Sequence, residues 1–282
     1  MRLSRVLTFA AYEARRAVAR KKVLALVALT ILIGVAPYYL LDALHDASVI
    51  TPPLRPYMWV VGVFLPQAFF VQFTALLIAA GSMSEEYEQG TAELLLSKPV
   101  SRAEFFFGKY LGGYTLLVAI MVMDAVLSTT SATFVFGPQA QLGLLPEVSA
   151  SQAVAATVFY SVAFMFGELT RRSSLSYIIS ASVFLTSEIL GGFLDFFYTL
   201  TGSAVYHTVN LFLPTSPVDS LPLLLAEPYF PGSISTIFRV GLATPVEPSV
   251  LASGALVAAY ALTAVLIALG YFSRMDISKR VT

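Results

Sequence analysis

Six long apolar stretches, separated by short charged segments, dominate the pattern of hydrophobic and polar positions along this chain. They run at roughly 23–41, 58–83, 103–130, 152–169, 174–198 and 249–272. A helix needs about 20 consecutive apolar residues to cross a bilayer, and each stretch is close to that length. The pattern therefore predicts an all-α polytopic membrane protein with six transmembrane helices.

Composition agrees with a membrane protein and excludes several kinds of chemistry. The chain is 57% hydrophobic and 12% charged, whereas soluble domains carry about 25% charged residues. It has no cysteine, which excludes disulfides, thiolate catalysis and Cys-based metal sites. A formal net charge of zero argues against nucleic acid as a partner. The strongly charged N-terminus, which lacks a small-residue cleavage site, is not expected to be a cleaved signal peptide.

The distribution of Lys and Arg predicts the orientation of the spans. If the six stretches cross the membrane, 15 of the 17 Lys and Arg residues lie on one side of it, and only Arg55 and Arg239 lie on the other. Positive charge is retained on the cytoplasmic side of membranes. We therefore expect a multi-pass protein of the cytoplasmic (plasma) membrane with both termini in the cytoplasm.

The first 22 residues predict an interfacial helix. One face of that helix is apolar, and most of the bases lie off it, so the helix can lie along the membrane with its bases towards lipid phosphates. An alternative is a plain cytoplasmic extension of the first span. The apolar positions are Leu3, Val6, Leu7, Ala10, Ala11, Ala14 and Val18.

Residues 199–248 predict a cap on the outer side. This segment holds seven of the 15 prolines, and its apolar pieces are too short to cross a bilayer. Irregular backbone at membrane depth is tolerated only where protein or water covers it. We expect short helices folded over the outer mouth of one transmembrane domain, residues 1–282.

The segment 84–102, between the second and third spans, carries the strongest local signals. Ser82 followed by Glu85 has the spacing of a helix N-cap, Pro99 predicts a break, and Ser101 with Glu104 predicts a capping box. The expected order is helix, tight break, helix, on the cytoplasmic side. Four acids (Glu85, Glu86, Glu88, Glu93) precede the bases Lys98 and Arg102. This arrangement indicates a docking element for a soluble partner; the alternative is a solvated, well-capped loop.

This segment resembles the permease subunits of type-2 ATP-binding-cassette (ABC) transporters. In those proteins a cytoplasmic segment reads acid–base–x–x–Gly–Thr, then a Leu-rich stretch, then Pro-x-Ser-Arg and soon a Gly-Lys. The corresponding residues, with Tyr87 in place of the family's frequent base, are Glu86-Tyr87-Glu88-Gln89-Gly90-Thr91, Leu94-Leu95-Leu96, Pro99-Val100-Ser101-Arg102 and Gly108-Lys109.

The resemblance implies a permease that dimerises, a homodimer being expected, and that couples to a separate ATPase subunit, most often for export. The chain itself contains no G-x-x-x-x-G-K-[ST] motif, so it is expected to be non-catalytic and to bind no cofactor, with ATP and Mg on the partner. The residues that the resemblance assigns to ATPase coupling are Glu85, Glu86, Tyr87, Glu88, Gly90, Thr91, Pro99 and Arg102.

Three acids fall inside predicted spans: Asp124, Glu188 and Asp195. A charge in the bilayer is costly, so each is expected to face protein or water. They are candidates for a translocation path, and the alternative is a packing or interhelical hydrogen-bonding role. Two other functions stay open: an ion- or proton-coupled secondary transporter using the acids of the fifth span, and a non-transporting membrane anchor for an ATPase. The two histidines, His45 and His207, are far apart in sequence and predict no metal site.

Overall fold

The chain is an all-α bundle. A computed structural model describes residues 2–43, 54–97, 100–232 and 249–274, and within these ranges it contains helices and turns but no strand. Six helical segments are long and apolar enough to cross a membrane, which confirms the six-span prediction. They are Lys21–Ala43, Arg55–Glu88, Arg102–Phe136, Leu142–Thr170, Ser173–Thr201 and Val250–Arg274.

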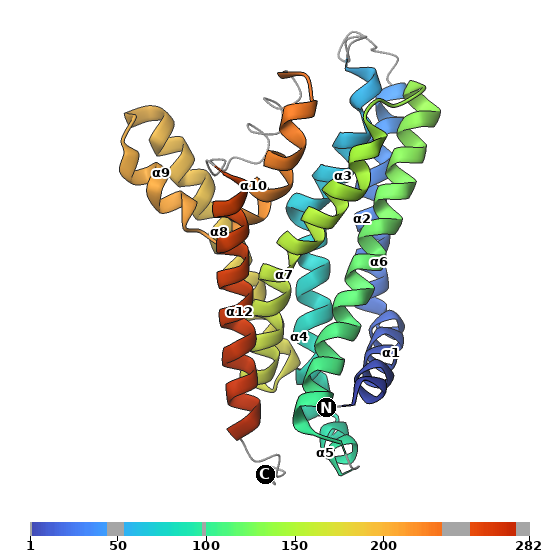
Figure 1. The fold of residues 1–282 in the computed structure, drawn as a ribbon, viewed down its shortest axis with the longest axis vertical. Helices are drawn as coiled ribbons and strands as arrows, with labels where there is room; N and C mark the ends of the chain where they lie inside the picture. Colours follow the sequence, from blue (N-terminus) through green and yellow to red (C-terminus); the bar gives the residue numbers. More distant parts are fainter. Residues whose placement is uncertain (1, 44–53, 98–99, 233–248, 275–282) are drawn as a thin grey trace.

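The N-terminal helix is separate from the first span. Helix α1 (Leu3–Ala19) ends where Arg20 adopts an extended conformation (ψ 117°), and α2 (Lys21–Ala43) begins at the next residue. A plain extension of the first span is therefore wrong. Figure 1 shows α1 beside the lower end of α6 (Arg102–Phe136), and these two helices pack closely. Its predicted position along the membrane stays a prediction.

The second span is a composite helix. A 3-10 turn (Arg55–Tyr57) leads into α3 (Trp59–Pro66), a π-helical segment (η2, Gln67–Val71) and α4 (Gln72–Glu88). Proline lacks the N–H that a regular helix needs, and the π-helical segment begins directly after Pro66. It rejoins the regular helix within five residues.

The predicted N-cap at Ser82 is wrong, because α4 continues through this residue to Glu88. Ser82 and Ser84 are buried inside this helix, and the Ser84 hydroxyl donates to the Ala80 carbonyl oxygen at 2.6 Å, so neither serine caps the start of a new helix. The break comes at Gly90, whose φ of +68° is a left-handed conformation that glycine adopts without steric cost. The short helix α5 (Thr91–Leu96) follows.

The third span begins as the sequence predicts. The Ser101 hydroxyl accepts from the Glu104 backbone N–H at 3.2 Å, and the Ser101 N–H donates to the Glu104 carboxylate at 3.0 Å, which confirms the capping box. The α6 helix then continues for 35 residues to Phe136.

The core centres on α7 (Leu145–Thr170), which packs against α4, α12 (Val250–Arg274) and α10 (Thr215–Ala226). Aromatic side chains fill the space between α6, α7 and α12. Phe106 meets Phe164 edge to face at 5.2 Å between ring centroids. These contacts stabilise the helix packing through van der Waals and aromatic interactions, because apolar burial against lipid supplies little hydrophobic driving force.

The region predicted as the cap contains α9 (Ala204–Leu211), α10 and a 3-10 turn (Glu227–Tyr229), all after the end of α8 (Ser173–Thr201). Nearly all of α10 is buried against α7 and α12. The helix pair 204–211 and 215–229 is bent by 88°, the geometry of a broken span or re-entrant loop. Residues 233–248 of the predicted cap lie outside the described residues.

Candidate coupling site at the α5 end

Helix α5 lies beyond the lower end of the bundle, between α4 and α6 (Figure 1). Ala92 is buried and both Leu95 and Leu96 pack on the core, whereas the Leu94 side chain is 69% exposed. The leucine triplet therefore anchors α5 with two members and presents the third outward. The Leu94 side chain is therefore available for contact at this end of the bundle.

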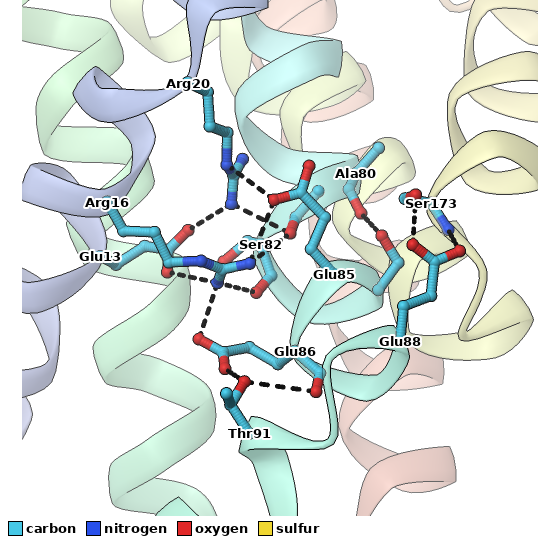
Figure 2. A network of polar contacts seen from close by, with 12 residues as sticks. Glu13, Arg16, Arg20, Ala80, Ser82, Glu85, Glu86, Glu88, Thr91 and Ser173 are labelled. Atoms are coloured by element: carbon cyan, nitrogen blue, oxygen red, sulfur yellow. Dashed lines mark hydrogen bonds and ion pairs between the residues drawn. The ribbon is translucent and has the colours of Figure 1, made fainter.

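A buried ion network lies next to Thr91, the first residue of α5, and Figure 2 shows its side chains from α1 and α4. The Lys109 ammonium of α6 donates to the Glu13 carboxylate of α1 at 2.6 Å and to the Glu86 carboxylate of α4. Arg16 of α1 donates to the same Glu86 carboxylate at 2.7 Å. Lys109 and Glu13 are fully buried and Glu86 is 1% exposed. Three helices are thus joined through one cluster of charges.

The network extends to Glu85. Its carboxylate lies 3.2 Å from Arg16 and 3.0 Å from Arg20, and it accepts a hydrogen bond from the Tyr177 hydroxyl of α8 at 2.6 Å. Arg20 also donates to the Gly81 carbonyl oxygen at 3.0 Å. In Figure 2 the guanidinium groups of Arg16, in α1, and of Arg20, directly after α1, reach towards the last turns of α4.

Charge balance explains why these groups tolerate burial. Three acids (Glu13, Glu85, Glu86) face three bases (Arg16, Arg20, Lys109). The acids of α4 lie in its last turn, where the helix dipole disfavours negative charge, so the cations from α1 and α6 offset both the dipole and the loss of hydration. At the edge of this cluster, desolvation and then the charge of Glu86 raise the pKa of the Tyr12 hydroxyl in α1.

Tyr87 and Glu88 attach α4 to the α7–α8 corner. The Tyr87 hydroxyl donates to the buried Glu168 carboxylate at 2.7 Å, and the Arg171 guanidinium lies 4.6 Å from the Tyr87 ring centroid. Glu88 accepts from the Ser173 N–H at 2.8 Å, at the start of α8. The tyrosine that replaces the family's base therefore makes a hydrogen bond within the chain.

We expect Tyr87→Phe to lower the free energy of unfolding by about 1–2 kcal/mol, because the buried Glu168 carboxylate loses a hydrogen-bond donor. Denaturant unfolding of the purified chain in mixed micelles measures this loss. Tyr12→Phe, a change at a tyrosine that is 42% exposed, is the matched control. Equal stability of the two variants would contradict a structural role for the Tyr87 hydroxyl.

The predicted coupling residues thus divide into two groups. Glu85, Glu86, Tyr87 and Glu88 face other helices of the chain. Gly90 forms the turn before α5, and the Thr91 hydroxyl at the start of α5 donates to the Glu86 carboxylate. Arg102 donates to the carbonyl oxygens of Phe272 and Ser273 at the end of α12. Pro99 lies outside the described residues.

Several residues of this site were not identified from the sequence. Glu13, Arg16 and Arg20 were expected only as part of an interfacial helix, and Lys109 only as part of a motif. Gly108 and Gly112 allow α1 to approach α6: a Cβ at Gly108 would lie 3.1 Å from the Val6 carbonyl oxygen, and one at Gly112 would lie 2.7 Å from the Ala10 Cα. The Gly-x-x-x-Gly spacing of residues 108–112 is the signal that could have indicated this helix contact.

The three intramembrane acids do not form one cluster. Asp124 is buried in α6 against Gly34 of α2, and its Oδ1 atom has no hydrogen-bond partner among the described residues. Glu188 and Asp195 lie half-buried on α8. An apolar groove of about 450 Å³ follows α8, and Ser187 rather than Glu188 lines it. Within the described ranges, no group of three His, Asp or Glu side chains is placed to hold a metal ion.

Six helical segments long and apolar enough to cross a bilayer define a multi-pass membrane protein. The chain belongs to the ABC-2 family of transporter proteins: the family model, described as "ABC-2 family transporter protein", matches residues 7–277. It is accordingly a membrane protein of this family.

Among curated proteins, the chain is similar to "Uncharacterized protein YhcI" of Bacillus subtilis (strain 168). The two are 24% identical over 168 residues, which cover 53% of this chain and 53% of the relative. The match therefore spans about half the length of that relative. It supports common ancestry and assigns no substrate.

Proposed function

We propose that this chain is the permease subunit of an ATP-driven exporter and that α5 is its contact with a separate ATPase subunit. ATP and Mg would bind to that partner, and two copies of the chain would form the translocation unit. Export and the homodimer rest on the family resemblance alone. The contact through α5 rests on the geometry of this chain.

The observation that carries the proposal is the position of α5. It lies beyond the bundle, with Leu94 exposed, between α4 and α6, which supply half of the buried ion network. The positive-inside bias predicts that this end faces the cytoplasm, where an ATPase subunit would be found. A soluble partner could therefore reach α5 without entering the membrane.

The ion network gives this contact a mechanical consequence. Thr91 joins the start of α5 to Glu86, and Glu86 binds Lys109 of α6 and Arg16 of α1. Glu85 continues the connection to α8 through Tyr177. A displacement of α5 by the closing ATPase pair would therefore move α1, α4, α6 and α8 together rather than bend a loose loop.

The test is Leu94→Glu in the full chain, co-expressed with the ATPase subunit of its native host. We expect the apparent affinity for that subunit to fall about tenfold or more, equivalent to about 1.4 kcal/mol, because a charge would replace an exposed apolar contact. Quantitative co-purification in detergent measures it, and thermal unfolding of the chain alone should remain at the wild-type temperature.

Leu142→Glu is the matched control, because Leu142 is also partly exposed but lies in the connection between α6 and α7 at the opposite end. It should leave co-purification unchanged. If Leu94→Glu and wild type bind the ATPase subunit equally, α5 is not the contact. If transport continues without nucleotide, the proposal that the transporter is driven by ATP is wrong.

A further inference from the structure

A buried acid lies between α2, α3 and α6 without a counter-charge. The Asp124 side chain of α6 is 3% exposed, and its Oδ1 atom has no hydrogen-bond partner among the described residues. None of the ion pairs within the described ranges includes Asp124. Acids inside a membrane are almost always paired, because an isolated charge there is costly. Asp124 therefore needs a partner that the described part of the chain does not supply.

Glycine residues bring backbone oxygen atoms of the other two helices to this carboxyl group. A Cβ at Gly34 of α2 would lie 2.5 Å from Asp124 Oδ1 and 3.1 Å from the carbonyl oxygen of Gly62 in α3. The carboxylate and this carbonyl oxygen thus approach the same point, which only a residue without a side chain leaves open. Figure 1 shows α2, α3 and α6 side by side, and each pair of them is in contact.

The Gly62 carbonyl oxygen lacks its regular helical donor. In a continuous α-helix it would accept from the N–H four residues later, but that residue is Pro66, which has no N–H. The Gln67 N–H donates instead to the Phe64 carbonyl oxygen. In broken membrane helices, backbone carbonyl oxygens released in this way coordinate Na⁺ or H⁺. The interruption at Pro66 therefore leaves an oxygen ligand beside Asp124.

Two hydroxyl groups and a second carbonyl surround the same place. An added Cβ at Gly62 would meet oxygen atoms on both neighbouring helices, namely Ser128 Oγ of α6 and the Gly34 carbonyl oxygen and Tyr38 hydroxyl of α2. Ser128 lies one turn after Asp124, and its Oγ atom is 2.9 Å from Tyr38 Oη. The Tyr38 hydroxyl accepts from the Gly62 N–H at 2.8 Å and so holds the three helices in register.

We propose that this oxygen cluster binds one Na⁺ ion, with Asp124 as the charged ligand and the Gly62 carbonyl, the Gly34 carbonyl and the Ser128 hydroxyl as neutral ligands. Hard cations prefer oxygen donors. A single carboxylate offsets the whole charge of a monovalent ion but only half that of a divalent one, and the close helix contacts at both glycines favour a small ion. The ion would join α2, α3 and α6 as the buried bases join α1, α4 and α6 at the α5 end.

The test measures sodium binding and stability on the purified full chain in detergent. Thermal unfolding is compared at equal concentrations of sodium, potassium and choline chloride, which keeps the ionic strength constant. Radioactive sodium measures binding directly by equilibrium dialysis. We expect about one bound ion per chain and an unfolding temperature about 5 °C higher in sodium than in choline, because a ligand that binds only the folded state stabilises it. Potassium should stabilise less.

Asp124→Asn should lower sodium binding at least tenfold and remove the difference between the salts. This variant should unfold in choline at the wild-type temperature or above, because asparagine keeps the shape of the side chain and leaves no charge to be neutralised. A loss of binding in a stable variant separates a missing ligand from a damaged fold. Ser128→Ala, which removes one neutral ligand and keeps the carboxylate, should weaken sodium binding about fivefold.

Glu188→Gln is the matched control, since it neutralises another intramembrane acid, half-buried on α8, and should keep wild-type sodium binding. Equal stabilisation by all three salts, or wild-type binding by Asp124→Asn, would overturn the proposal. So would a wild-type chain that binds no sodium and loses stability as the pH rises while Asp124→Asn does not, because a proton would then neutralise Asp124. No ATPase or nucleotide is present, so the result is independent of the Leu94 test.

Discussion

Replacing Lys109 with Met is expected to lower the free energy of unfolding by about 3–5 kcal/mol, the usual effect of removing one partner from a buried ion pair. Methionine fills a similar volume, so the loss arises from charge rather than from a cavity. Glu13 and Glu86 would both remain buried after losing their shared cation. Denaturant unfolding of the full chain in mixed micelles measures the change.

Two further variants show that the loss comes from the network. Lys22→Met removes an exposed lysine and should alter stability by less than about 1 kcal/mol. Lys109→Met combined with Glu86→Gln should recover part of the loss, because one of the two stranded acids becomes neutral. If Lys109→Met unfolds at the same denaturant concentration as Lys22→Met, the ion network does not stabilise this end of the protein.

Replacing Gly112 with Val is expected to cost about 3 kcal/mol, the upper end of the usual range for overpacking. A side chain at Gly112 would meet the backbone of Ala10, and backbone atoms have no alternative rotamer. The substitution therefore pushes α1 away from α6 and separates Glu13 and Arg16 from Lys109 and Glu86. Unfolding measurements should show the loss, and limited proteolysis should show faster cleavage within residues 3–19.

Gly254→Val is the comparison variant, since Gly254 lies in α12 with no heavy atom within 4 Å of an added Cβ. Both variants make the same change in intrinsic helix preference, so the difference between them isolates the α1–α6 contact. Gly254→Val should remain close to wild type. Equal proteolysis of α1 in the two variants would contradict the role of Gly112.

The six spans were predictable because each satisfies the bilayer by itself, through length and apolar composition. The capping box of Ser101 and Glu104 was predictable for a similar reason, since its partners are three residues apart. The end of α4 was not. Ser82 and Glu85 have the spacing of an N-cap, yet cations from α1 and α6 stabilise the acids inside a continuous helix.

Even less of the candidate site could be predicted from the sequence. The sequence placed the coupling segment between the second and third spans, and α5 lies there. It did not indicate that most of the acids face inward, because that depends on Glu13, Arg16 and Arg20, which are about 70 residues upstream of them. Distant charges can be paired only when helix packing is known, whereas local caps and turns depend on neighbours in the sequence.

The order in which the charged residues occur along the chain has a consequence for biogenesis. Glu13, Arg16 and Arg20 are synthesised first, then Glu85 and Glu86, and Lys109 last. A nascent chain that has inserted only two spans therefore has three of these acids facing two bases. The cluster becomes neutral only when the ribosome has added the start of the third span, so Lys109 links the arrival of that span to the folding of the two before it.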